Sequence, residues 1–240
     1  MTEDIARLIE LLDDDSGDIA EDAKQELMSI GPGVAQPLMA AVPRMHRYGQ
    51  LCAIELFEYL GDASSAPVLI GLLDSEHETV REWSADALTQ MGIQAAVPAL
   101  RAAYQRLRAT GTPPDFTEPV ALRRALTLLG ARRQVLPPLT ASLQVSTGPW
   151  DAMWPAARLE EVINDLAEHN QAILYFSLWT VTDTGTYWTN HETLRREFNP
   201  HAPWPQAVAI AREMALLETA FIPARENLVA LVEWIDESDV

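Results

Sequence analysis

Arginine side chains are the residues of this chain best suited to hold a ligand, and they gather in one region. Residues 101–133 hold seven arginines and two carboxylates, a net charge of +5, although the whole chain carries −18. A guanidinium group binds a carboxylate or a phosphate through two parallel hydrogen bonds. The stretch predicts a binding site for an acidic peptide or a phosphate-bearing ligand. The alternative is a solvated helix face that balances the acidic ends.

Spacing divides these candidates into two groups. Arg101 and Arg108 are seven residues apart and therefore share one face of a helix, with Tyr104 and Gln105 between them. Arg123 and Arg124 lie on the next helix of the pattern. We predict that the members of both groups contact a partner.

Aromatic residues in the C-terminal part are the second set of binding candidates. Six of the seven tryptophans lie after residue 148. Residues 172–181 and 186–189 are rich in β-branched and aromatic types and flank Asp-Thr-Gly, which indicates a hairpin. We predict that Tyr175, Trp179 and Trp188 share a concave surface with Arg101, Arg108 and Arg124, where ring faces would hold the body of an anionic, partly apolar ligand.

Catalytic and metal-binding motifs are weak in this sequence. His77-Glu78 and His191-Glu192 resemble the dipeptides that bind iron in one helical-repeat hydroxylase family, but one lies in a loop and the other outside the repeats. The five histidines show no helical ligand spacing, and no phosphate-binding loop, dinucleotide motif, nucleophile elbow or Cys–His arrangement occurs. The sequence predicts no catalytic residue, no metal and no cofactor, and it predicts that Cys52 is a packing residue.

The acidic charge limits the classes of partner. A net charge of −18 is repelled by nucleic acid and by anionic membranes, so neither is expected as a partner. Residues 13–22 hold six carboxylates, which indicates a turn and helix start or, alternatively, an attraction for a basic partner. No run of apolar residues is long enough to span a membrane, no signal peptide begins the chain, and Cys52 is the single cysteine, so we expect a cytoplasmic protein. Arginine outnumbers lysine 16 to 1, which favours a GC-rich bacterial source.

A repeat organises the first 145 residues. Four glycines each follow an apolar residue, and other apolar residues stand four positions before each glycine, as at a helix end: Gly31, Gly61, Gly92 and Gly130. A proline six or seven residues later would start a second helix: Pro37, Pro67, Pro98 and Pro137. We expect at least eight helices in antiparallel pairs across 4–143. The insert at 110–119, with two adjacent prolines, should form an exposed loop between the third and fourth pairs.

The best-formed unit, residues 74–104, resembles the HEAT-like repeats of bilin-lyase proteins. The matching features are Asp74, Val80-Arg81, Ala87-Leu88, Gly92 and the run from Ala96 to Leu100. The resemblance covers about 5–143 and implies a right-handed α-solenoid whose second helices line the concave surface. It also implies that the Asp and Arg of neighbouring units pair.

The C-terminal part, 146–240, is expected to be a capping domain that follows a four-repeat solenoid domain at 1–145. Residues 155–168 have apolar side chains at helical spacing, and helices are also predicted at 191–198, 205–219 and 223–236 beside the hairpin. The fold is therefore expected to be mainly α with one small hairpin.

The function predicted from these features is a non-enzymatic scaffold that holds a protein or peptide in the groove of the solenoid. One alternative is an acidic immunity or antitoxin protein that neutralises a basic toxin. Another, implied by the resemblance, is a lyase-type enzyme or an accessory protein that handles a small molecule. The partner and the oligomeric state are not specified by the sequence.

Overall fold

The computed structural model describes residues 2–146, 152–182, 185–192, 198–199, 202–223 and 225–240, with the backbone alone at 2–3, 146, 152 and 185–192. The chain divides into two compact units. The first unit contains residues 1–107 and 117–133, and the second contains 108–116 and 134–240. The sequence pattern predicted a single boundary near residue 145, whereas here the segment 108–116 groups with the later unit.

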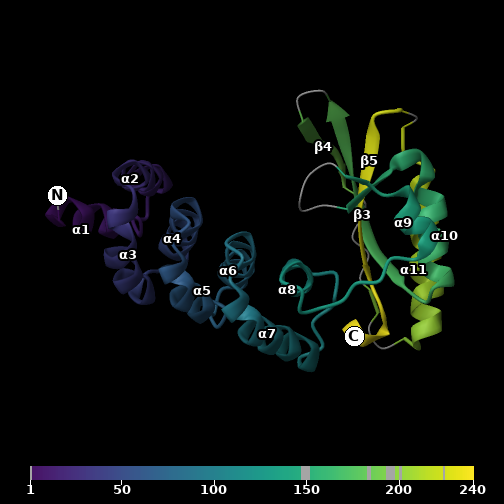
Figure 1. Ribbon diagram of the computed structural model, residues 1–240, viewed down its shortest axis with the longest axis horizontal. Helices are drawn as coiled ribbons and strands as arrows, with labels where there is room; N and C mark the ends of the chain where they lie inside the picture. The colour runs from purple at the N-terminus through teal and green to yellow at the C-terminus, as the bar shows by residue number, and fades with distance from the viewer. Residues whose placement is uncertain (1, 147–151, 183–184, 193–197, 200–201, 224) are drawn as a thin grey trace. The chain divides into compact units, whose positions relative to one another are not determined.

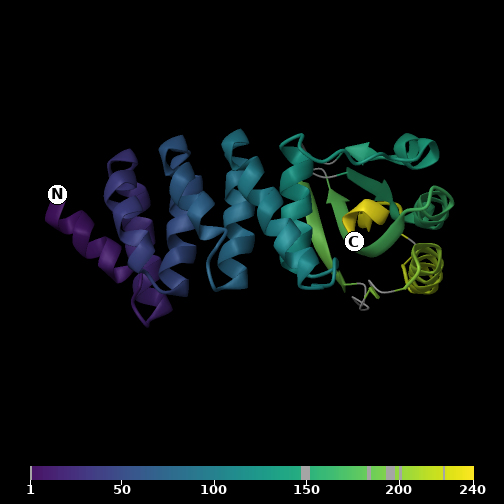
Figure 2. The same cartoon turned by 90° about the horizontal axis from the view of Figure 1, so that it is seen from below.

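The first unit is a row of helical pairs that follows α1 (Thr2–Leu11), and this confirms the predicted α-solenoid (Figures 1 and 2). We call the first members of the pairs the first-helix row: α2 (Gly17–Ile30), α4 (Arg47–Leu60), α6 (Glu78–Gln90) and α8 (Thr117–Leu128). We call the second members the second-helix row: α3 (Ala35–Ala41), α5 (Ala66–Leu72) and α7 (Val97–Ala109). Residues 2–143 contain nine α-helices, the last being α9 (Pro138–Leu143).

The predicted helix ends are confirmed. The four repeat glycines lie one or two residues after the ends of the first-row helices, and each has a positive φ. At Gly61 the backbone is left-handed, with φ of 62° and ψ of 19°, and its N–H closes the helix by donating to the carbonyl oxygens of Phe57 and Glu58. Phe57 and Leu27, which the pattern placed on the inner face, are fully buried in one continuous core of the unit.

The fourth pair differs from the prediction. Its second helix, α9, packs on α10 (Leu159–Glu168) in the second unit. The buried carboxylate of Asp165 on α10 accepts hydrogen bonds from the Thr140 backbone N–H at 2.6 Å and from its hydroxyl at 2.7 Å. Trp154 then donates its indole N–H to the Thr140 carbonyl oxygen at 2.8 Å. Because these partners lie 14 to 25 residues away, the local repeat pattern could not indicate them.

The second unit is built on a five-stranded antiparallel sheet with the order β1-β2-β5-β3-β4. Its strands are β1 (Val145–Ser146), β2 (Ala152–Pro155), β3 (Ala172–Thr182), β4 (Gly185–Glu192) and β5 (Leu228–Ile235). The expected hairpin is confirmed as β3 and β4. One face of the sheet packs its core against α10 and α11 (Trp204–Thr219), which confirm the helices expected at 155–168 and 205–219 (Figure 1).

The helix predicted at 223–236 is wrong, because β5 occupies 228–235 in the middle of the sheet. Nearly every residue of this strand is buried, so its sequence, LVALVEWI, lacks the alternation that marks a strand with one solvated face. The helix predicted at 191–198 is wrong at its start, where His191 and Glu192 belong to β4, and residues 193–197 lie outside the described part of the chain.

The insert at 110–119 does interrupt the helices between α7 and α8, as predicted. It is not uniformly exposed, however, since Pro114 and Asp115 are buried and α8 already begins at Thr117. The exposed part is confined to Thr110, Gly111 and Phe116. Helix α7 thus ends at Ala109, just before Gly111 with its positive φ of 72°, and Pro114 and Asp115 then pack against protein rather than facing solvent.

Candidate functional site

The arginines of α7 belong to the second-helix row, whose helices contain no carboxylates. The second-helix row carries three arginines, all on α7, and no Asp or Glu. Arg101 is exposed and donates to the Ala131 carbonyl oxygen at 3.3 Å. Arg106 donates to the Asp74 carboxylate at 2.6 Å, and Arg108 donates to the Val240 backbone oxygen. Arg101 therefore holds the most available of these guanidinium groups.

Two of the predicted contact residues are not on the surface, which corrects the prediction for them. Tyr104 belongs to the core of the first unit, and Arg123 is 1% exposed. Both lie on the inner side of their helices, so neither ring nor guanidinium faces solvent. Their neighbours Gln105 and Arg124 are exposed.

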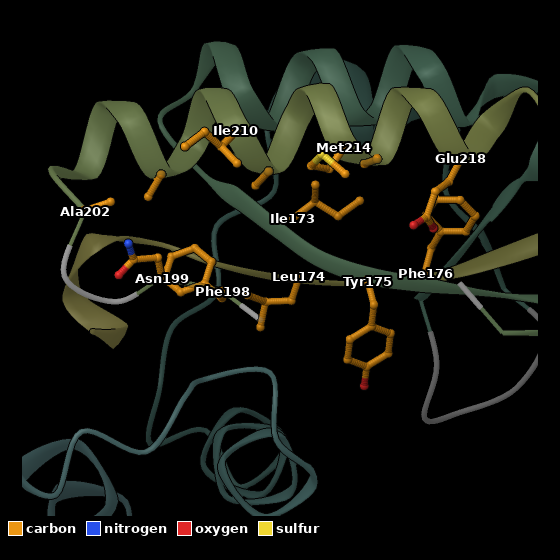
Figure 3. Close-up of a pocket in the computed structure, with 13 residues that line it drawn as sticks. Ile173, Leu174, Tyr175, Phe176, Phe198, Asn199, Ala202, Ile210, Met214 and Glu218 are labelled. Carbon is orange, nitrogen blue, oxygen red and sulfur yellow. The ribbon is translucent and has the colours of Figure 1, made fainter. Parts of the chain in front are cut away.

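The aromatic candidates lie on β3 and β4 of the second unit. Tyr175 points away from α11, toward the opposite side of the sheet (Figure 3). Trp179 is half-buried and donates its indole N–H to the Ser177 hydroxyl at 3.0 Å. Trp188 is the Cα partner of Trp179 across the hairpin, and its side chain lies outside the described residues. A surface shared with Arg101 and Arg124 stays a prediction, because those arginines belong to the other unit.

The first-helix row has the opposite charge. Helices α2, α4 and α6 carry nine carboxylates and three basic residues. Lys24, the only lysine of the chain, is buried between α2 and α4 and pairs with Glu21 at 2.8 Å and with Glu55. Burial alone would lower the pKa of Lys24, but hydrogen bonds to these two carboxylates raise it above its usual value. A single lysine among sixteen arginines is the sequence signal that could have identified this ion cluster.

A second group of carboxylates lies between α4 and α6. Burial raises the pKa of Glu58, and the nearby Asp86 and Glu55 raise it further. Burial also raises the pKa of Asp86, against the opposing effect of Arg124. Crowded carboxylates on neighbouring helices favour a cationic partner more than a neutral one.

The ion pairs at these positions differ from the Asp–Arg pairing that the family resemblance implies. Arg81 forms two hydrogen bonds of 2.6 Å with Glu118 at the start of α8, and it also donates to the Ser75 carbonyl oxygen at 2.8 Å. Asp74 pairs with Arg106 and not with Arg81. The Arg81–Glu118 pair ties the third helical pair to the fourth, whereas Asp74 and Arg106 belong to the same repeat.

The remaining sequence candidates behave as structural residues. Cys52 is 2% exposed in the core, which confirms its packing role, and burial raises the pKa of its thiol to about 11. In the acidic start, Asp13 accepts from the His46 backbone N–H and Asp14 accepts from that of Ser16, so these carboxylates shape turns. Among the described side chains, no three His, Cys, Asp or Glu residues are grouped closely enough to hold a metal ion. No described helix is long and apolar enough to cross a membrane.

A hollow of about 110 Å³ lies between α11 and β3 in the second unit. Figure 3 shows it running along the helix from Ala202 and Asn199 at one end to Glu218 at the other. Its apolar lining comes from the sheet, the helix and the segment before it: Ile173, Phe176, Phe198, Ile210 and Met214. The sequence did not predict this site, because its walls come from a strand and a helix that are not adjacent along the chain.

Comparison with known proteins supports the assignment of the first unit and adds nothing on the second. No curated protein matches the chain. Residues 35–109, which contain α3 to α7, match the family model described as HEAT repeats. Together with the helical pairs and the glycine-closed first helices, this match supports HEAT-like repeats in the first unit.

Proposed function

We propose that the chain is a non-enzymatic scaffold whose HEAT-like domain binds a protein or peptide, with residues 134–240 as a separate C-terminal domain. The observation that carries the proposal is the match of residues 35–109 to HEAT repeats, since arrays of such helical pairs commonly present extended protein-binding surfaces. Fold by itself does not specify a partner, so the choice of surface must come from the side chains.

The second-helix row is the surface that we propose for the contact. Arg101 and Gln105 are exposed on α7, in a row of helices that carries no carboxylate, whereas Arg106 is held by Asp74 and Arg108 by the Val240 backbone oxygen. An acidic peptide segment is the partner that this surface fits. Arg124, on the first-helix row, would lie outside this contact.

Charge reversal of Arg101 tests the proposal. The full chain serves as bait in cells of its source, and bound proteins are identified by mass spectrometry. The Arg101→Glu variant, alone and with Arg108→Glu, should lose the principal partner, with binding weakened by more than about 2 kcal/mol. Its melting temperature should stay nearly unchanged, because exposed charges contribute little to folding. Unchanged capture by Arg101→Glu would rule out this surface.

The acidic first-helix row favours a second candidate, an immunity or antitoxin protein that covers a basic toxin. Nine carboxylates on α2, α4 and α6, with Glu58 and Asp86 crowded together, would attract a cationic surface. In this case the double variant Glu58→Gln/Asp86→Asn should lose the partner and Arg101→Glu should retain it.

The lyase-type alternative differs from both, since the purified chain would then bind a chromophore or another small molecule without any protein partner.

A further inference from the structure

Helix α11 has apolar side chains on two faces, and only one of them is covered. The buried face packs on the sheet and on α10 through Trp204, Val208, Ala211 and Ala215. A second set, which we call the apolar stripe, follows the spacing 4, 3, 4 and consists of Ile210, Met214, Leu217 and Phe221. On α11 this spacing places Ile210, Met214 and Leu217 in one line, as at the core positions of a coiled coil, and Phe221 follows just beyond the helix end.

The apolar stripe is exposed along most of its length. Ile210 is 47% exposed, Leu217 is 58% exposed, and Phe221, just beyond the helix end, is 81% exposed, whereas Met214 is half-buried. Single exposed apolar residues are common on protein surfaces, but a continuous row of them marks an interaction site. The row is therefore a candidate for contact with another helix.

The hollow beside α11 gives this surface a shape that a helix can use. Ile210 and Met214 belong both to the apolar stripe and to the wall of the hollow, opposite Ile173 and Phe176 of β3 (Figure 3). A volume of about 110 Å³ accommodates one large apolar side chain. A helix laid along the stripe could insert such a side chain into the hollow, in the manner of helix-in-groove complexes.

The charges beside the apolar stripe favour a different protein over a second copy of this chain as its partner. On the helix, Glu213 flanks the apolar stripe on one side and Glu218 flanks it on the other. Arg212 lies away from the stripe and donates to Asn164 on α10 at 2.7 Å. Two copies packed stripe to stripe would bring these carboxylates together, and each copy carries a net charge of −18. A partner with basic residues beside its apolar positions would instead gain ion pairs.

We propose that the apolar stripe and the hollow beside it form a docking site for an amphipathic helix of another protein with Lys or Arg flanking its apolar face. This site lies in the second unit and does not depend on the proposed function of the HEAT-like domain. Apolar anchors would supply the affinity, and Glu213 and Glu218 would set the orientation of the bound helix.

A synthetic peptide is the probe for this proposal. The full chain is titrated into a fluorescently labelled helical peptide with Leu at the core heptad positions and Lys at the flanking ones, at physiological salt. Leu217→Glu should raise the Kd at least about tenfold, which corresponds to about 1.4 kcal/mol. The matched control is Leu139→Glu on α9 of the same unit, which is 41% exposed and should leave the Kd unchanged. Glu213→Gln/Glu218→Gln should weaken binding and reduce its dependence on salt.

Four results would overturn the proposal. A scrambled peptide of equal composition that binds as tightly would reduce the effect to general charge attraction. An equal loss of peptide affinity in Leu139→Glu would show that the apolar stripe is not the binding site. A loss of affinity in Glu58→Gln/Asp86→Asn with none in Leu217→Glu would place the peptide on the first unit. A dimer in analytical ultracentrifugation that Leu217→Glu dissociates would identify a second copy as the occupant. Thermal unfolding of each variant, with Leu217→Ala as a milder substitute, separates lost binding from lost structure.

Discussion

The two units of this protein are stabilised by contacts of different range along the chain. In the first unit each helix of the first-helix row packs on the next one, so that α2 contacts α4, α4 contacts α6 and α6 contacts α8. In the second unit the last strand, β5, lies between β2 and β3 and pairs with both. A repeat array of the first kind is stabilised by near neighbours, while a sheet of the second kind requires the whole unit.

Tryptophan allows the two units to be followed separately. Trp83 is the only tryptophan of the first unit, and the other six belong to the second. Fluorescence therefore reports mainly on the second unit, whereas helical circular dichroism reports mainly on the first.

The largest effect is expected from the core of the first unit. Phe57 is fully buried in α4, and Phe57→Ala should destabilise the unit by about 4 kcal/mol through lost burial and a residual cavity. In urea, the circular dichroism transition should move to a lower concentration while the fluorescence transition keeps its midpoint. A common shift of both signals would show that the two units unfold together, and it would contradict the expectation that the first unit unfolds independently of the second.

A slightly smaller effect is expected from the link between α9 and α10. Asp165→Ala removes the acceptor of two hydrogen bonds from Thr140 and should cost about 3 kcal/mol, because buried donors lose their partner. Here the fluorescence transition should move and the circular dichroism of the first unit should not. Glu168→Ala, at an exposed position of the same helix, is the control.

Two ion pairs of equal length should contribute differently to stability, because one is buried and the other is exposed. Glu118 is 4% exposed in its side chain and bonds Arg81 at 2.6 Å, whereas Asp74 is 73% exposed and bonds Arg106 at the same distance. Glu118→Gln should cost about 2 kcal/mol, since it weakens a charge-assisted bond in a buried setting. Asp74→Asn should cost less than about 0.5 kcal/mol, because solvent screens an exposed pair. Equal losses in chemical denaturation would disprove this assignment.

The smallest effect concerns pH. The folded chain holds a proton on Glu58 more tightly than the unfolded chain, because burial and the neighbouring Asp86 and Glu55 raise its pKa above the ordinary 4.5. Ionised Glu58 therefore opposes folding above its folded pKa, and this penalty disappears as the pH falls toward 4.5. Glu58→Gln should stabilise the protein by about 0.5 kcal/mol at neutral pH and by nothing in acid.

Glu55→Gln is the control for this pH effect, because Glu55 is a partner of Lys24 and its replacement should destabilise the protein at neutral pH. The free energy of unfolding measured between pH 4 and pH 8 distinguishes the two variants. A gain from Glu58→Gln that persists in acid would point to packing instead of charge.

Prediction from the sequence succeeded where the signal and its cause lie within one helix turn. Gly61 ends α4 and Pro67 lies in the first turn of α5, because these residue types act on their own backbone. The binding candidates fared less well. Arg123 is buried although its charge suggested exposure, and the hollow beside α11 was not foreseen.

By itself, the sequence determined the helical pairs of the first unit, the hairpin of β3 and β4, and the positions of α10 and α11, since periodicity and turn residues encode such elements locally. Only the tertiary structure decided that residues 228–235 form a central strand, that α9 packs on α10, and that the stripe on α11 faces solvent. Each of these features depends on residues far along the chain, because a run of apolar residues does not specify which other segment will pack against it.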